Sequence, residues 1–233
     1  MEPSLKNAYV QRDRAREHFG DLEVLAERIC AEEGKATVTE VKLEVNLKVN
    51  PPVLYKDLYK VVKRGDTPIP TRCSVLAGEV INCLRSALDY LVANLAALDS
   101  PTLETRPQFP VESTQEGFDG KRGTYLRGVN EPHVAFIESL QPCNGCKWTK
   151  HLARLSNLHK HNDLLPVQHD ILYFIHLEPI ESTEPNTSPY KVNMEFQPTL
   201  YVGLDDGLPL IETLKEIESQ VSQTLDAFDP EFK

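Results

Sequence analysis

The chain has 233 residues, of which 40% are hydrophobic and 26% charged, and its formal net charge is −10. This is the composition of a globular protein large enough to bury a core, and the acidic balance argues against nucleic-acid binding through the overall field, which repels phosphate. No apolar run approaches the ~20 residues of a membrane span, and the N-terminal sequence MEPSLKNAYV lacks the apolar core of a signal peptide. The five cysteines are scattered and odd in number. We therefore expect a cytoplasmic protein with no membrane contact and no disulfides.

The charge is unevenly distributed along the chain. Residues 164–233 hold 13 acidic and 3 basic side chains, whereas residues 1–163 hold 22 of each. The segment from Ser139 to Asn162 contains no Asp or Glu. It carries the basic residues Lys147, Lys150, Arg154 and Lys160, together with three histidines. A solvated basic helix face explains such a segment, and a local phosphate-binding surface is the alternative.

The N-terminal part of the chain predicts one helix and one hairpin. Apolar residues recur at near-helical spacing over residues 4–33, with Ser4 as a candidate cap. The segment VKLEVNLKV (41–49) alternates between apolar and polar residues, which predicts a half-buried antiparallel strand. A turn at Asn50-Pro51-Pro52 leads into a second predicted strand over residues 53–63.

The rest of the chain predicts further helices and two strands. The strongest helix covers residues 74–98 and is expected to begin at a Ser74 cap, whereas residues 99–130 show little regular signal and are expected to form a long loop. The remaining predicted elements are helices at 131–140, 147–163 and 208–228, and strands at 164–177 and 190–204.

Helices and strands are segregated along the chain, without βαβ alternation, which predicts an α+β fold with an antiparallel sheet. Helices 74–98 and 147–163 should form a helical hairpin at the core, and the two terminal helices should be amphipathic. We expect a single domain over residues 1–233. Its parts would be a helical core (74–165), strands within 36–63 and 164–204, and the C-terminal helix (208–228).

A polar stripe follows one side of the predicted helix 147–163. At 100° per residue, Lys150, Asn157 and His161 lie within about 60° of Arg154. The opposite, apolar side comprises Trp148, Leu152, Leu155 and Leu158. His159 falls inside this apolar side, which predicts a core or interface histidine.

The helix 74–98 carries a second polar stripe, formed by Asn82, Arg85 and Asp89. If the two stripes meet, Asp89 could pair with Arg154 or orient His161, and Arg85 could bind an anion. The alternative is an internal network, because buried polar groups must be hydrogen-bonded and such a set can satisfy itself without a substrate.

Four segments together resemble a widespread group of bacterial proteins with N-x-x-R-S-A-L-D and N-x-x-K-H helices. They are NCLRSALDYL (82–91), FP (109–110), IESLQP (137–142) and LSNLHKH (155–161). The resemblance covers residues 74–165. The helix pair is also similar to the HEPN superfamily, which comprises all-helical domains associated with nucleotides and RNA. Many HEPN proteins are metal-independent ribonucleases with an Arg-x4–6-His motif.

Within this resemblance, Arg154 with His159 or His161 matches the motif. Asn157 and His161 keep the spacing of the common R-N-x-x-x-H form, whereas Ser156 stands in place of its arginine. The resemblance implies a homodimer and an RNA or nucleotide ligand, without a cofactor. A toxin or anti-phage defence role is the corresponding biological expectation.

The chemistry implied is attack of an RNA 2′-OH on the adjacent phosphate. His161 would act as general base or acid, and Arg154 with Lys150 would stabilise charge on the phosphorane oxygens. Asp89 or Asn82 would hold the imidazole in one tautomer.

Two alternatives remain open at this point. The segment QPCNGCKW places Cys143 and Cys146 in a C-x2-C arrangement, and twelve residues separate Cys146 from His159, which makes the three a candidate zinc site. The other alternative is a non-catalytic interaction or scaffold module of a bacterial complex, with a protein partner and a purely structural polar network.

Overall fold

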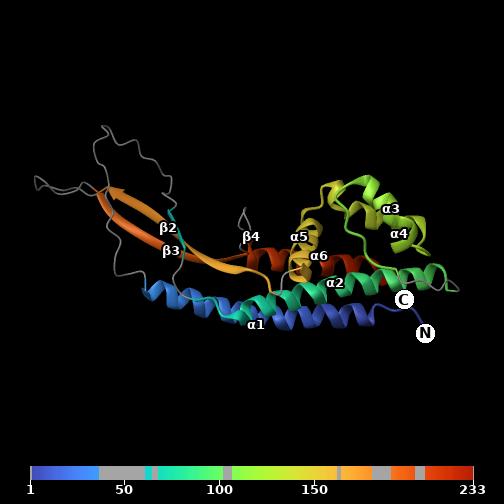
Figure 1. The fold of residues 1–233 in the computed structure, drawn as a ribbon, viewed down its shortest axis with the longest axis horizontal. Coiled ribbons are helices and arrows are strands. Elements are labelled where there is room, and N and C mark those ends of the chain that lie inside the picture. The colour runs from blue at the N-terminus through green and yellow to red at the C-terminus, as the bar shows by residue number, and fades with distance from the viewer. Residues whose placement is uncertain are drawn as a thin grey trace, which may run out of the picture. The chain divides into compact units, whose positions relative to one another are not determined.

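The computed structural model describes residues 2–36, 61–64, 68–101, 107–161, 164–179, 190–202 and 208–232. Its helices are α1 (Lys6–Ala36), α2 (Thr71–Asp99), α3 (Gln115–Tyr125), α4 (Glu131–Ser139), α5 (Lys147–His161) and α6 (Leu210–Phe228), with short 3₁₀ helices η2 (Pro142–Asn144) and η3 (Asp229–Phe232). Its strands are β1 (Val61–Arg64), β2 (Val167–Pro179), β3 (Tyr190–Val202) and β4 (Leu208–Pro209) (Figure 1). The fold is α+β, as predicted.

The chain forms two compact units. One comprises residues 1–24, 70–166 and 210–233 and is helical, and the other comprises residues 25–69 and 167–209 and contains the sheet. Within the helical unit, α2 packs against both α5 and α6, and α5 also packs against α6. The predicted hairpin between helices 74–98 and 147–163 is therefore confirmed. The single domain stays a prediction, because a compact unit is not by itself an independently folding domain.

Helix α2 is the centre of the helical unit because its sequence is apolar on nearly every side. A helix that is hydrophobic all round must be surrounded by other elements. Its fully buried residues include Val80, Ile81, Leu84, Leu88, Leu91 and Leu95, each 0% exposed. The helix begins at Thr71 after Pro70, whose side chain makes no capping bond, so the predicted start at a Ser74 cap is wrong. Ser74 is buried instead, one turn inside the helix.

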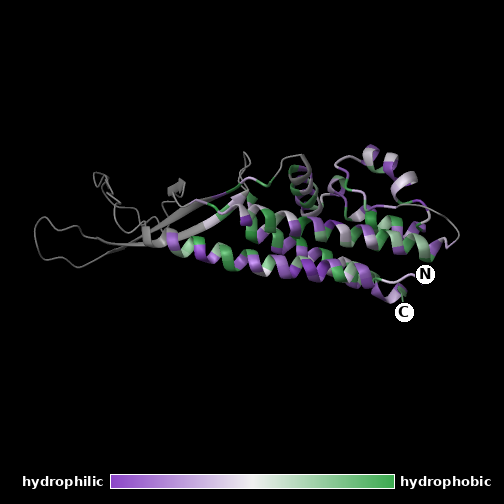
Figure 2. Ribbon diagram, turned by 60° about the horizontal axis from the view of Figure 1, so that its bottom comes forward, coloured by the Kyte–Doolittle hydropathy of each residue, from purple (hydrophilic) through white to green (hydrophobic). Residues whose placement is uncertain are grey.

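Helices α1 and α6 each bury one stripe of apolar residues, and hydrophobic residues recur along every helix of the bundle (Figure 2). Successive members of a stripe are three, four or seven residues apart, the pattern of a helix that packs along a seam. They contain Ala8, Ala15, Phe19 and Leu22 in α1, preceded by Leu5 just before the helix, and Leu210, Leu214, Ile217, Val221, Leu225 and Phe228 in α6. Polar contacts border the seam, including Arg16 Nε to Glu218 Oε1 at 2.6 Å and Tyr9 Oη to Asp226 Oδ1 at 3.2 Å.

The predicted loop over residues 99–130 contains a helix, α3, that the sequence pattern did not indicate. Its 11 residues include three glycines, which lower helix propensity by about 1 kcal/mol each relative to alanine. Two tertiary features compensate for this cost. Thr114 caps the helix, since its Oγ1 accepts a hydrogen bond of 3.1 Å from Gly117 N, and Phe118 is 0% exposed.

The sheet has the strand order β1-β2-β3-β4 with antiparallel neighbours, so the predicted antiparallel sheet is confirmed. Strands β2 and β3 pair along their full lengths, from Val167 opposite Val202 to Pro179 opposite Tyr190. Strand β1 pairs with β2 and is the described end of the second predicted strand. The predicted strand 41–49 lies outside the described residues.

None of the five cysteines takes part in a disulfide bond. Among the described residues, none of the helices combines the length and apolar character that a membrane crossing requires.

Candidate functional site

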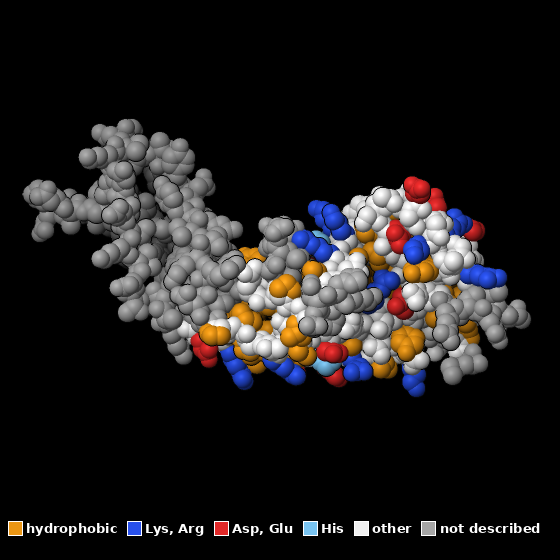
Figure 3. All heavy atoms as spheres, viewed as in Figure 1, with side chains coloured by type: hydrophobic (Ala, Val, Ile, Leu, Met, Phe, Trp, Pro, Cys, Tyr) orange, Lys and Arg blue, Asp and Glu red, His pale blue; other side chains and the backbone are white. Residues whose placement is uncertain are grey.

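The amphipathic character predicted for α5 agrees with the exposure of its side chains. Trp148, Leu152 and Leu155 are buried, whereas Lys150 and Asn157 are exposed. Lys and Arg side chains lie at the upper end of α5 in the space-filling view (Figure 3). Within the described part of the stripe, Lys150 and Asn157 therefore face solvent.

The other residues of the predicted catalytic group are half-buried, or their side chains are not among those that the structure describes. Arg154 is half-buried and has an interaction partner. His159 and His161 belong to the last turn of α5, beyond the last described side chain of that helix. Ser156 is only 3% exposed. The position where the common HEPN form has its arginine is therefore a core position in this chain.

The polar stripe on α2 holds a loop segment in place. Phe109, which is 0% exposed, donates its backbone N–H to Asp89 Oδ1 at 2.8 Å, and its carbonyl accepts a hydrogen bond from Arg85 Nη2. The Arg85 guanidinium also lies 6.0 Å from the centre of the Phe109 ring, and its Nη2 is 3.8 Å from Asp89 Oδ1. Buried backbone groups require such partners. Both polar groups of the Phe109 backbone thus have a partner on α2, and Asn82, on the same helix, is half-buried.

This arrangement is the internal network that the sequence left as an alternative for the α2 stripe. It uses an arginine and a carboxylate to satisfy a buried loop, which needs no ligand. The roles predicted for Arg85 as an anion site and for Asp89 as a partner of Arg154 or His161 stay predictions.

The side-chain amide of Gln141 is buried just before α5. Gln141 is 0% exposed; its Oε1 accepts a bond of 3.0 Å from Glu112 N, and its Nε2 donates one of 3.0 Å to Ile137 O. Thr149 of α5 donates its hydroxyl to Leu140 O at 2.7 Å. The Thr149 bond ties the first turn of α5 to the end of α4, and the Gln141 bonds hold the connecting segment against α4 and Glu112.

The predicted zinc pair lies just before α5. Cys143 is part of η2, and Cys146 follows Gly145, whose φ of 84° lies in the left-handed region that favours glycine. Both cysteines are half-buried, and Cys143 Sγ lies 4.0 Å from Gln115 Oε1. Among the described side chains, no third metal ligand joins this pair. His159, the third residue of the predicted site, has no described side chain.

The structure also brings together a buried carboxylate and imidazole that the sequence analysis did not connect. Asp99, at the end of α2, accepts hydrogen bonds from Asn130 N at 2.8 Å, from Asn130 Nδ2 at 2.9 Å and from His133 Nδ1 at 2.8 Å. Nε2 of His133 faces Glu231 at 3.9 Å, and its ring packs edge-on against Phe228. An Asp–His pair is common in catalysis, but both nitrogens of this imidazole face carboxylates. The pair therefore anchors the start of α4 to α2.

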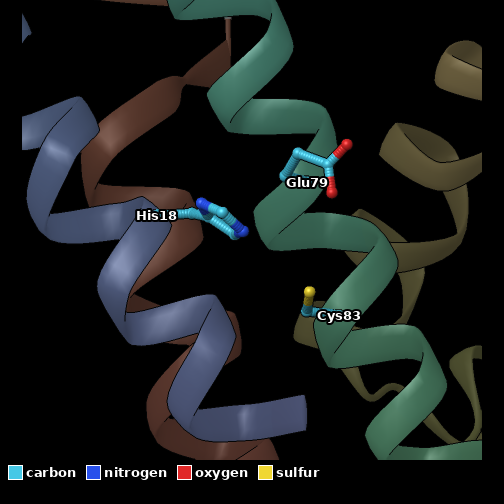
Figure 4. Close-up of side chains that lie close together, drawn as sticks. All are labelled: His18, Glu79 and Cys83. Carbon is cyan, nitrogen blue, oxygen red and sulfur yellow. The ribbon is translucent and has the colours of Figure 1, made fainter.

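A second grouping missed by the sequence analysis joins α1 to α2. His18 of α1 lies against Glu79 and Cys83 of α2, and one ligand atom from each lies within 4.8 Å of the other two (Figure 4). Among the described residues, this is the one set of three or more His, Cys, Asp or Glu side chains placed to hold a metal ion. The only sequence signal was the i, i+4 spacing of Glu79 and Cys83, because His18 is far away along the chain.

Comparison of the chain with protein-family models, with curated proteins and with solved structures found no match. The likeness to HEPN proteins therefore rests on the motif residues alone.

Proposed function

We propose that this protein binds RNA or nucleotides through the basic face of α5 and acts there as a HEPN-like, metal-independent ribonuclease. The observation that carries the proposal is the α5 face itself. Lys150 and Asn157 are exposed on it beside the half-buried Arg154, in a segment without acidic residues. Lysine and arginine bind phosphate through charge and hydrogen bonds, and asparagine can donate to phosphate oxygens.

The reaction would use the last two turns of α5. As the RNA 2′-OH attacks the phosphorus, the P–O bond to the 5′-oxygen of the next nucleotide would break, leaving a 2′,3′-cyclic phosphate and a 5′-OH. Arg154 would stabilise the charge that develops on the phosphate oxygens. His161 would either take the proton from the 2′-OH as general base or give one to the leaving 5′-oxygen as general acid. Asn157 lies one turn before His161 and would position the phosphate. Because an imidazole titrates near neutral pH, such a reaction needs no metal ion.

Binding and cleavage are tested separately. A labelled single-stranded RNA is titrated at several salt concentrations against the wild-type protein and a Lys150→Ala variant. We expect Lys150→Ala to weaken binding and to reduce the salt slope by about one, as loss of one phosphate contact does. Lys215→Ala on α6, an exposed lysine near Glu212 and Glu216, removes the same charge and is the matched control. Equal effects of the two substitutions would contradict a binding face on α5.

Cleavage is measured without added metal and in the presence of a chelator, for wild type and His161→Ala. Loss of cleavage in His161→Ala with an unchanged melting temperature supports the catalytic role. If wild type cleaves no RNA and His161→Ala lowers the free energy of unfolding by about 1–3 kcal/mol, the residue belongs to a hydrogen-bond network instead.

A second candidate function is a non-catalytic interaction module. The observation that favours it is that Arg85 and Asp89 bind the backbone of Phe109, while Ser156 is buried where the related motif has arginine. In this case the wild-type protein neither binds nor cleaves RNA, and its partner is a protein. The predicted homodimer is tested by sedimentation at micromolar concentration.

A further inference from the structure

We propose that His18, Glu79 and Cys83 form a zinc site between α1 and α2. Glu79 and Cys83 are four residues apart on one helix and so project from the same side. The imidazole of His18 reaches across from α1 toward these two side chains (Figure 4). Their ligand atoms already lie within 4.8 Å of one another.

The set of donor atoms selects the metal. One imidazole nitrogen, one thiolate and one carboxylate oxygen are all ligands that zinc accepts, whereas magnesium and calcium require oxygen alone. The thiolate and the carboxylate together carry two negative charges, which balance a divalent cation. Three protein ligands leave one coordination position open to water, as in catalytic rather than structural zinc sites.

The distances require only a small adjustment of side chains. Zinc binds its ligands at about 2.0–2.3 Å, so ligand atoms on one ion lie somewhat closer together than the present 4.8 Å limit. Glu79 is the most exposed of the three residues, and its side chain is long enough to turn toward the other two.

His18 supplies a second argument for a ligand at this place. Its Nε2 is buried and has no hydrogen-bond partner among the described residues. A buried nitrogen without a partner destabilises the fold, and coordination to a metal would satisfy it. Of the described side chains, only Nδ1 of His151 is similarly buried without a partner, and His151 has no such neighbours.

Cys83 is 5% exposed, and burial is the main cause that raises the pKa of its thiol. The charge of Glu79 raises this pKa further, whereas the nearby Arg14 lowers it. Zinc must displace the thiol proton in order to bind. Zinc coordination by this sulfur should therefore release protons.

The first test is metal binding by reduced, metal-free protein. Cys143→Ala/Cys146→Ala serves as the background, since it removes the competing pair of thiols near η2. We expect this background to bind one zinc ion per chain with proton release, and to show a thiolate-to-cobalt charge-transfer band when Co²⁺ is the probe. The proposal would be overturned if wild-type protein bound no zinc at micromolar concentration. It would also be overturned if the Cys143→Ala/Cys146→Ala background, in which Cys83 is intact, failed to bind.

The second test assigns the ligands. In the same background, His18→Ala, Glu79→Gln and Cys83→Ala should each weaken zinc binding by at least about 100-fold. This is the upper end of the range for loss of a residue that only hydrogen-bonds to a metal ligand. Cys73→Ala is the matched control, since Cys73 is a buried cysteine of α2 outside the cluster.

Each variant is first checked for helix content and for the fluorescence of Trp148. Glu79→Gln is the variant least disturbing to the core, and it keeps the test decisive if Cys83→Ala fails to fold. Zinc affinity that is unchanged in Glu79→Gln and His18→Ala would contradict the proposed ligands.

Discussion

The backbone N–H of Phe109 donates a hydrogen bond of 2.8 Å to Oδ1 of Asp89 in helix α2. Phe109 is fully buried, so its N–H has no access to solvent. A carboxylate acceptor in this position explains why a charged residue lies near the apolar centre of α2. It also gives Asp89 a role in stability that can be measured apart from any catalytic role.

We expect Asp89→Ala to lower the free energy of unfolding by about 1–3 kcal/mol, because it leaves the Phe109 N–H without an acceptor. Asp89→Asn keeps an acceptor oxygen and should cost less. Urea unfolding followed by the fluorescence of Trp148, the single tryptophan, measures both values. Equal losses for the two variants would show that the charge, and not the hydrogen bond, is what matters.

The hydrogen bonds of Asp99, which join the end of α2 to the start of α4, should contribute more to the free energy of unfolding than a surface ion pair does. Asp99 accepts three hydrogen bonds from Asn130 and His133, so Asp99→Ala should cost about 3 kcal/mol, the upper end for such a buried acceptor. Asp13→Ala is the control; Asp13 is an exposed carboxylate that pairs with Arg12, and its loss should cost under about 1 kcal/mol. Thermal unfolding compares the two, and similar losses would contradict the assigned role.

The glycines of α3 offer a matched pair of substitutions. A Cβ at Gly120 would meet nothing within 4 Å, so Gly120→Ala should stabilise the protein by about 0.5–1 kcal/mol. A Cβ at Gly117 would lie 2.8 Å from Glu112 Oε2 and 3.1 Å from Thr114 Oγ1, the oxygen that caps the helix. Gly117→Ala should therefore gain less, or destabilise. Chemical unfolding measures the difference, and an equal gain at both positions would contradict this account of the cap.

Tyr9 should reduce stability at alkaline pH. Burial, followed by the charges of Asp229 and Asp226, raises its pKa to about 12, against the lowering effect of Arg12. An unfolded tyrosine has a pKa of about 10. Between these values the folded chain keeps a proton that the unfolded chain loses, so the contribution of Tyr9 is intact below about pH 10 and is lost as the pH rises toward 12.

The test compares wild type with Tyr9→Phe, which has no phenol proton at this position. The free energy of unfolding should fall more steeply with pH in wild type than in Tyr9→Phe over this window. Spectrophotometric titration should show one tyrosine fewer among the late-titrating groups of the variant. Parallel stability curves would contradict the shift.

Much of the fold follows from periodicity along the chain. Apolar spacings of three and four in α5 and α6 predicted helices with one buried side, and Trp148, Leu152 and Leu155 are buried as expected. Local patterns of this kind depend only on the geometry of a helix or a strand. Helix α3 escaped prediction because its glycines mask the pattern and its stability depends on Phe118 and the Thr114 cap.

The sequence by itself determined the α+β class, the helical hairpin of α2 and α5, and the basic character of the α5 face. Only the tertiary structure decided which polar residues meet. Ser156 is buried, Asp89 binds Phe109, and His18 lies against Glu79 and Cys83. Such contacts join residues far apart in the chain, and they depend on how the helices rotate and slide against one another as their apolar sides pack. Neither quantity is encoded in local spacing.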